Sequence, residues 1–378
     1  MNENPLLSIQ KFGQSIWLDF IERKMIISGQ LKKLIDEDGI RGVTSNPSIF
    51  KEAIAKGEEY ENDIRSLARK NKSKEEIYQT LTVDDIQQTA DLFRPLYDSS
   101  GGGQGFVSLE VNPHLARDID GTLEEARRLW FAVERPNVLI KVPATAEGLT
   151  CIQQLISEGI NINVTLLFGL PRYRKVAEAY IAGMEARSKK NLPLKRIASV
   201  ASFFLSRIDV RIDSLLEKLI ERGGDRAEQA RNLRGQIAIA SARQAYQIYK
   251  EIFRNERFKP LARQGARPQR VLWASTSTKN PDYSDVKYVE ALIGAETINT
   301  LPQKTLDAYR DHGNPACRLE EDLNKASEIF HKLRELDIDI DEQTRELEDE
   351  GIRKFIEPYD SLMETLEEKR NQIAGTGS

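Results

Sequence analysis

Short apolar runs alternate along the chain with longer amphipathic segments. Several of these runs, such as NVLIKV and IASVASFF, are β-rich and hardly alternate between apolar and polar positions, which is typical of strands covered by helices on their outer face. We therefore predict eight strands, at residues 16–19, 39–44, 105–111, 137–142, 160–166, 197–203, 270–275 and 296–301.

The segments between these runs have helical spacing. Residues 147–158 place four aliphatic side chains on one side of a helix, and Pro171 marks the first turn of another. Residues 204–222 and 226–254 are each predicted to form a long helix. Regular alternation of strand and helix predicts a parallel sheet, and eight units favour closure into a (β/α)8 TIM barrel. An open, doubly wound sheet is the alternative that the pattern leaves open.

Two regions of the chain do not fit a pattern of eight strand–helix units. Residues 47–104 are too long for one crossover, so we predict two or three helices inserted after the second strand, followed by a glycine-rich turn into the third. We assign residues 1–316 to the barrel and residues 317–378 to a helical extension, in which Pro358 should kink or restart the helix. An apolar stripe in this extension should pack on the barrel or on a partner in a homodimer; it consists of Ile352, Phe355, Ile356, Tyr359, Leu362, Met363 and Leu366.

The amino-acid composition then limits which kinds of site and binding partner we expect. The chain has 378 residues, of which 40% are hydrophobic, and this is ample for a large core. Its three histidines and two cysteines are scattered, so we predict neither a metal site nor a disulfide framework. With 55 basic and 59 acidic residues, the chain has no general attraction to nucleic acid or to a membrane surface. We find no secretion signal and no long apolar run, and we expect a cytoplasmic protein.

Polar residues at the ends of barrel strands are the first candidates for chemistry, because active sites of such barrels lie there. Lys141 is flanked by apolar residues within the fourth strand. It is either an ion-paired or snorkelling lysine, or a desolvated amine that forms a Schiff base with a carbonyl substrate. Glu110 and Asp19 should face the same interior, as ion-pair partners of Lys141 or as general acids and bases.

Further polar residues end the other strands. Four of them are small and neutral: Asn46, Asn163, Thr165 and Ser202. The two amides either satisfy local backbone groups or hold substrate hydroxyls, and the two hydroxyls are weak signals. Arg207 and Lys279 follow the sixth and seventh strands, where barrels often bind phosphate, although surface cations are the more common case.

Six separated segments, in the right order and each on its own predicted strand, resemble motifs of the transaldolase family. They are WLD (17–19), GVTSNPS (42–48), SLEV (108–111), IKVPAT (140–145), NVTL (163–166) and SFFLSRID (202–209). This resemblance implies a TIM-barrel transferase of the pentose phosphate pathway that needs neither a metal nor an organic cofactor. It implies transfer of a dihydroxyacetone unit from sedoheptulose 7-phosphate or fructose 6-phosphate to glyceraldehyde 3-phosphate or erythrose 4-phosphate.

The resemblance also implies roles for individual residues. Lys141 would be the Schiff-base nucleophile, and Asp19 would exchange the proton of the sugar C4 hydroxyl. Glu110, with Thr165 and a water molecule, would move protons while the imine forms and breaks down. The implied substrate-binding residues are Asn46 and Asn163 for hydroxyls, Ser202 for the dihydroxyacetone end, and Arg207 and Ser275 for phosphate.

One position departs from the family pattern. Shorter members carry an arginine two residues after the serine of strand 7, whereas this chain has Ser277 there. The nearest cation is Lys279, which would bind phosphate as a point charge without a bidentate fork.

Two alternatives accompany the transaldolase interpretation. A Schiff-base aldolase of the fructose-6-phosphate aldolase kind would release dihydroxyacetone, and a non-catalytic barrel would act as a scaffold. Glu110 favours the transferase, since related aldolases tend to use a tyrosine there. The retained polar strand ends argue against the scaffold.

Overall fold

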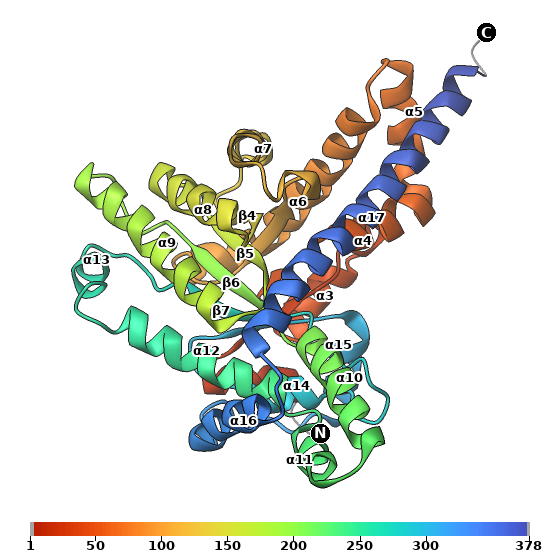
Figure 1. The fold of residues 1–378 in the computed structure, drawn as a ribbon. Coiled ribbons are helices and arrows are strands. Elements are labelled where there is room, and N and C mark those ends of the chain that lie inside the picture. The colour runs from red at the N-terminus through yellow and green to blue at the C-terminus, as the bar shows by residue number, and fades with distance from the viewer. Residues whose placement is uncertain (1–3, 376–378) are drawn as a thin grey trace.

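Eight parallel strands form a closed barrel in the computed structural model, which describes residues 4–375 (Figure 1). Neighbours in the barrel follow chain order, and β1 pairs with β8 to close it. The barrel prediction is therefore confirmed, and the open sheet is not formed. The strands are β1 (Ser15–Leu18), β2 (Gly42–Val43), β3 (Phe106–Glu110), β4 (Val138–Pro143), β5 (Ile162–Leu167), β6 (Ser199–Phe204), β7 (Arg270–Ala274) and β8 (Ile298–Leu301).

Helices surround the barrel and connect its strands. The first half of the chain contributes α1 (Pro5–Ile9), α2 (Arg23–Ile27), α3 (Gln30–Glu37), α4 (Pro47–Lys56), α5 (Glu61–Arg69), α6 (Lys74–Ser99), α7 (Ile119–Val133), α8 (Ala146–Glu158) and α9 (Leu170–Lys189). The second half contributes α10 (Ser206–Arg222), α11 (Asp225–Leu233), α12 (Ile237–Phe253), α13 (Lys259–Arg263), α14 (Lys287–Ala291), α15 (Gln303–His312), α16 (Leu323–Glu335) and α17 (Ile340–Gly375). Short 3₁₀ turns occur at η1 (Gln10–Phe12), η2 (Glu58–Tyr60) and η3 (Pro113–Leu115).

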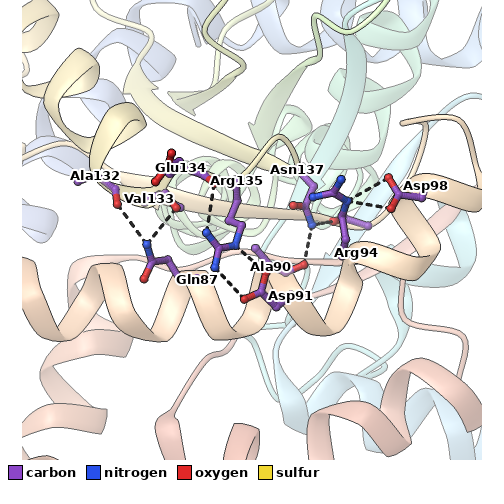
Figure 2. A network of polar contacts seen from close by, with 11 residues as sticks. Gln87, Ala90, Asp91, Arg94, Asp98, Ala132, Val133, Glu134, Arg135 and Asn137 are labelled. Atoms are coloured by element: carbon purple, nitrogen blue, oxygen red, sulfur yellow. Dashed lines mark hydrogen bonds and ion pairs between the residues drawn. The ribbon is translucent and has the colours of Figure 1, made fainter.

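The insertion after β2 consists of α4, α5 and α6, as the sequence predicts. Figure 2 shows how α6 holds the segment that leads into β4. Gln87 donates to two carbonyl oxygens of the last turn of α7, at 3.2 and 3.1 Å, which that helix end leaves unpaired. Asn137 Nδ2 donates to the carbonyl oxygens of Ala90 and Gly105 at 2.8 and 2.9 Å. These bonds fix the start of β4 and thereby the strand that carries Lys141.

The predicted single helix over residues 226–254 is wrong, because the structure divides it into α11 and α12. Gly235 lies between them with φ +71°, a left-handed conformation that glycine adopts readily. Its N–H donates to Asp213 Oδ1 at 2.8 Å. The break is therefore stabilised by a buried carboxylate on α10, a contact that periodicity cannot show.

The C-terminal helix α17 runs alongside α4, α5 and α6 (Figure 1). Its stripe is buried within the same chain from Ile352 to Leu366, and Leu362 and Leu366 are fully enclosed. Pro358 lies inside the helix without ending it, so the predicted restart does not occur. Packing of the stripe on both sides of Pro358 compensates for the lost backbone hydrogen bond.

The lower part of the barrel interior is filled by apolar side chains of the strands, namely Trp17, Phe106, Leu139, Val200, Leu272 and Ile298, and Tyr97 of α6 packs against them. Packing there is tight, since a Cβ added to Gly42 would lie 2.5 Å from the Trp17 ring. An active site is therefore expected above this layer, at the C-terminal end of the barrel. Among residues 4–375, no helix has both the length and the apolar character needed to cross a membrane.

Candidate active site

A cavity of about 340 Å³ opens at the C-terminal end of the barrel. Side chains alternate along each strand, so residues two positions after the apolar lumen layer point inward above it, as Asp19 does after Trp17 and Lys141 after Leu139. Eight of the ten predicted site residues border the cavity: Asp19, Asn46, Lys141, Thr165, Ser202, Arg207, Ser275 and Lys279. The other two, Glu110 and Asn163, are buried beside it.

Lys141 lies at the floor of the cavity and is only 4% exposed. Its Nζ donates to the carbonyl oxygen of Ser45 at 2.9 Å and to Glu110 Oε2 at 3.4 Å. Burial raises the pKa of Glu110 to about 7, against the opposing attraction of Lys141 and with a smaller contribution from Asp19. Glu110 can therefore take up and release a proton near neutral pH, as a general acid and base must.

Asp19 follows β1 and reaches the cavity from the wall opposite β5. Its Oδ1 accepts a hydrogen bond from Thr44 Oγ1 at 2.8 Å, and Thr44 Oγ1 lies 2.9 Å from Thr300 Oγ1. No cation is paired with Asp19 among residues 4–375. The carboxylate is therefore oriented by hydroxyl groups and left able to accept a proton from a ligand.

Asn163 and Ser202 form a hydrogen-bonded row beneath the cavity. Asn163 Nδ2 donates to Ser108 Oγ at 3.0 Å, and Asn163 Oδ1 accepts from Ser202 Oγ at 2.7 Å. Asn163 is fully buried, whereas Ser202 borders the cavity. The amide of Asn163 thus orients Ser202.

Thr165 presents a buried hydroxyl to the cavity, and this Oγ1 has no protein partner among the described residues. The ladder between β5 and β6 is irregular between Val164 and Leu167, and Leu166 has φ +54°, which is rare for a branched residue. Such irregularities re-aim side chains next to active sites. A buried hydroxyl without a partner is suited to hold a water molecule or a substrate hydroxyl.

Two cationic side chains and one serine border the cavity together, and we call Arg207, Lys279 and Ser275 the cationic rim. Arg207, at the start of α10, has a buried Nη1 without a hydrogen-bond partner in the described part of the chain, and burial lowers its pKa. Lys279 donates to Ser277 Oγ at 2.9 Å, and burial together with the nearby Arg207 charge lowers the Lys279 pKa. Ser275 borders the same space with φ +50°. Two cations held close together without a carboxylate bridge are ready to bind an anion such as phosphate.

Asn46 has a structural role as well as a place at the cavity. Its Oδ1 accepts from the backbone N–H of Ile49 at 3.0 Å and so caps α4. The backbone interpretation of this amide is therefore confirmed, and its NH₂ group is left for a ligand.

Sequence reasoning missed several contributors to the site, including Thr300, which borders the cavity and contacts Thr44. Phe355 of α17 borders the cavity, and the Lys141 Nζ lies 5.7 Å from the centre of its ring. The apolar stripe indicated packing for this phenylalanine and gave no sign of the site. The carbonyl oxygen of Ser45, the closest partner of Lys141, carries no signal because every residue has one.

Comparison with known proteins gives one consistent result. A family model described as Transaldolase/Fructose-6-phosphate aldolase matches residues 16–366. A protein named Transaldolase from Trichodesmium erythraeum is 48% identical over 377 residues, which cover 99% of each chain. Transaldolase from Thiobacillus denitrificans is 46% identical over 360 residues, covering 95% of this chain and 99% of the relative. Transaldolase 2 from Nostoc punctiforme is 46% identical over 374 residues, covering 98% of each chain.

Proposed function

This chain belongs to the transaldolase/fructose-6-phosphate aldolase family, and we propose that it catalyses the transaldolase reaction through a Schiff base at Lys141. A dihydroxyacetone unit passes from sedoheptulose 7-phosphate or fructose 6-phosphate to glyceraldehyde 3-phosphate or erythrose 4-phosphate. The observation that carries this proposal is the buried Lys141 Nζ at the cavity floor, 3.4 Å from a Glu110 whose pKa is about 7.

The first step joins Lys141 to the ketose. Glu110 takes a proton from the lysine, and the free amine adds to the substrate C2 carbonyl to form a carbinolamine. Protonated Glu110 then returns the proton to the departing hydroxyl, which leaves as water and gives the imine. The partner-free hydroxyl of Thr165 is suited to hold that water.

The second step breaks the C3–C4 bond. Asp19 takes the proton of the C4 hydroxyl, the C4 oxygen becomes the aldehyde of the departing aldose phosphate, and the bonding electrons move into the protonated imine to give an enamine. The hydroxyl of Thr44, 2.8 Å from Asp19 Oδ1, orients the carboxylate for this transfer. Addition to the acceptor reverses the same step.

The enamine must wait for its acceptor without being protonated by water. Phe355 and the surrounding apolar side chains exclude water next to Lys141. Asn46 and Ser202 hold hydroxyls of the bound unit, with Asn163 supporting Ser202 from below. Arg207, Ser275 and Lys279 hold the phosphate at the rim.

The acceptor requirement tests the function itself. With fructose 6-phosphate alone, we expect about one glyceraldehyde 3-phosphate per active site and then a stop, because the enamine stays on Lys141. Adding erythrose 4-phosphate should start continuous turnover. A coupled assay for both products measures this, and steady release of dihydroxyacetone without acceptor would identify an aldolase instead.

The pH dependence should report Glu110. A carboxyl that is already protonated cannot accept the Lys141 proton, so kcat/KM should fall as the pH drops below about 7, the pKa of Glu110. Initial rates at low substrate and constant ionic strength measure this limb. Glu110→Gln should remove the limb along with most of the activity, and an unchanged limb in that variant would assign it to another group.

We propose that residues 1–316 form the catalytic barrel and that residues 317–378 are an extension that completes the site through Phe355. Burial of the α17 stripe within its own chain removes the reason for expecting a partner there. The homodimer and the cytoplasmic location stay predictions from the sequence.

A further inference from the structure

Helix α10 carries two buried carboxylates directly after the arginine of the cationic rim. Arg207 lies in its first turn, and Asp209 and Asp213 follow at 1% and 5% exposure. Neither carboxylate borders the cavity. The reaction described above gives them no role, although two neighbouring buried carboxylates are costly to keep.

Both carboxylates are satisfied by groups from outside α10. Asp209 accepts from the backbone N–H of Ala238 at 2.8 Å, from Lys287 Nζ at 2.9 Å and from the hydroxyl of Tyr288 at 2.8 Å. Asp213 accepts from the Tyr283 hydroxyl at 2.7 Å and, as described above, from Gly235. The Lys287 Nζ also lies 3.8 Å from the centre of the Tyr283 ring. We call Asp209, Asp213, Tyr283, Lys287 and Tyr288 the α10 clamp.

The three side-chain donors of the α10 clamp belong to the segment that leaves β7. This segment begins with Ser275 and Lys279, two residues of the rim. It is also braced internally, since Thr278 Oγ1 donates to the carbonyl oxygen of Ser284 at 2.7 Å. One end of the segment therefore holds phosphate-binding groups, and its other end is fixed to the helix that supplies Arg207.

We propose that the α10 clamp sets the spacing between Arg207 and Lys279 and thereby the affinity of the rim for phosphate. The clamp residues are positioning residues that act through Arg207 and Lys279. The inference rests on the proposed function in one respect, namely that the rim binds a sugar phosphate. Lysine lacks the planar fork of arginine, so its contribution depends on where the backbone places it.

The double variant Tyr283→Phe/Tyr288→Phe tests this proposal with little change in volume. We expect the Kd for inorganic phosphate, measured by calorimetry, and the KM for glyceraldehyde 3-phosphate to rise by about fivefold to tenfold, because one buried and one half-buried hydrogen bond are lost. The kcat and the KM for unphosphorylated glyceraldehyde should stay within about twofold, because no group at the reacting carbons moves.

The matched control is Tyr180→Phe. The Tyr180 side chain is as buried as that of Tyr288, and its hydroxyl donates to the carbonyl oxygen of Arg267 at 2.6 Å, ahead of β7 and away from the rim. This variant should lose similar stability in thermal unfolding and keep the wild-type Kd for phosphate. If the double variant does not fold, Tyr288→Phe alone should still raise that Kd.

Two results would overturn the proposal: an unchanged phosphate Kd in folded clamp variants, or equal increases of KM for the phosphorylated and unphosphorylated acceptors. The proposed function is checked separately in the same samples by borohydride trapping at Lys141. Absence of the adduct in the wild-type protein would reject the Schiff base and leave the phosphate measurement interpretable.

Discussion

Replacing Lys141 with arginine should lower kcat by at least about 10⁴-fold, since the whole covalent route is lost. Arginine keeps a positive charge beside Glu110 and the Ser45 carbonyl oxygen, so the fold should be retained. A guanidinium stays protonated at all working pH values and cannot add to a carbonyl. Transfer from fructose 6-phosphate to erythrose 4-phosphate measures kcat, and circular dichroism checks the fold.

A matched replacement separates this effect from the general cost of exchanging lysine for arginine. Lys250 is mostly buried on α12 and pairs with Glu320 far from the cavity. Lys250→Arg should keep kcat within about twofold, as surface and half-buried substitutions away from a site usually do. Near-normal turnover in folded Lys141→Arg would contradict the proposed nucleophile.

Replacing Asp19 with asparagine should slow cleavage of the C3–C4 bond by about 10² to 10⁴-fold, the usual contribution of a general base. Asparagine keeps an acceptor for Thr44 Oγ1, so the local hydrogen bond survives while the proton acceptor is lost. The imine should still form, because Lys141 and Glu110 are unchanged. The variant should therefore accumulate the fructose 6-phosphate adduct and release little glyceraldehyde 3-phosphate.

Quenched single-turnover reactions distinguish these two steps. Borohydride quenching counts the adduct, and a coupled assay counts glyceraldehyde 3-phosphate in the same samples. Glu52→Gln is the control, because this carboxylate borders the same cavity and pairs with Lys56. If the adduct in Asp19→Asn formed as slowly as glyceraldehyde 3-phosphate appeared, Asp19 would act in imine formation instead.

The barrel could be predicted because its strands are marked by their composition. NVLIKV and ININVTLLF are continuous apolar runs, and such runs suit strands buried on both faces. The break at Gly235 could not be predicted. It depends on a hydrogen bond to Asp213, more than 20 residues earlier in the chain, and an isolated glycine within a helical pattern is commonly tolerated.

The packing partner of α17 could not be predicted from the sequence either. The stripe from Ile352 to Leu366 predicted a buried helix face but gave no direction for it. At Gly351, α17 approaches β5 closely, since a Cβ on this glycine would lie 3.0 Å from Leu166 Cδ2. Because Phe355 follows one turn later, this approach places an aromatic ring beside Lys141.

The candidate site was mostly predictable because strand ends converge in a closed barrel. Lys141 was marked by its apolar neighbours and Arg207 by its place after strand 6. Which of these residues can contact the ligand was not predictable. Alternation along the strands predicts that both Asn163 and Ser202 point into the barrel, but only Ser202 borders the cavity. Their different depths follow from the strand register, since Asn163 pairs with Val200 and Ser202 lies two residues further along β6.

Borohydride reduction in the presence of fructose 6-phosphate, followed by peptide mass mapping, tests the central claim most directly. Reduction converts the imine into a stable secondary amine that keeps the sugar fragment on its lysine. We predict one adduct per chain, on the peptide that contains Lys141, and none in Lys141→Arg. An adduct on any other lysine, or no adduct in a protein that turns over, would contradict this account.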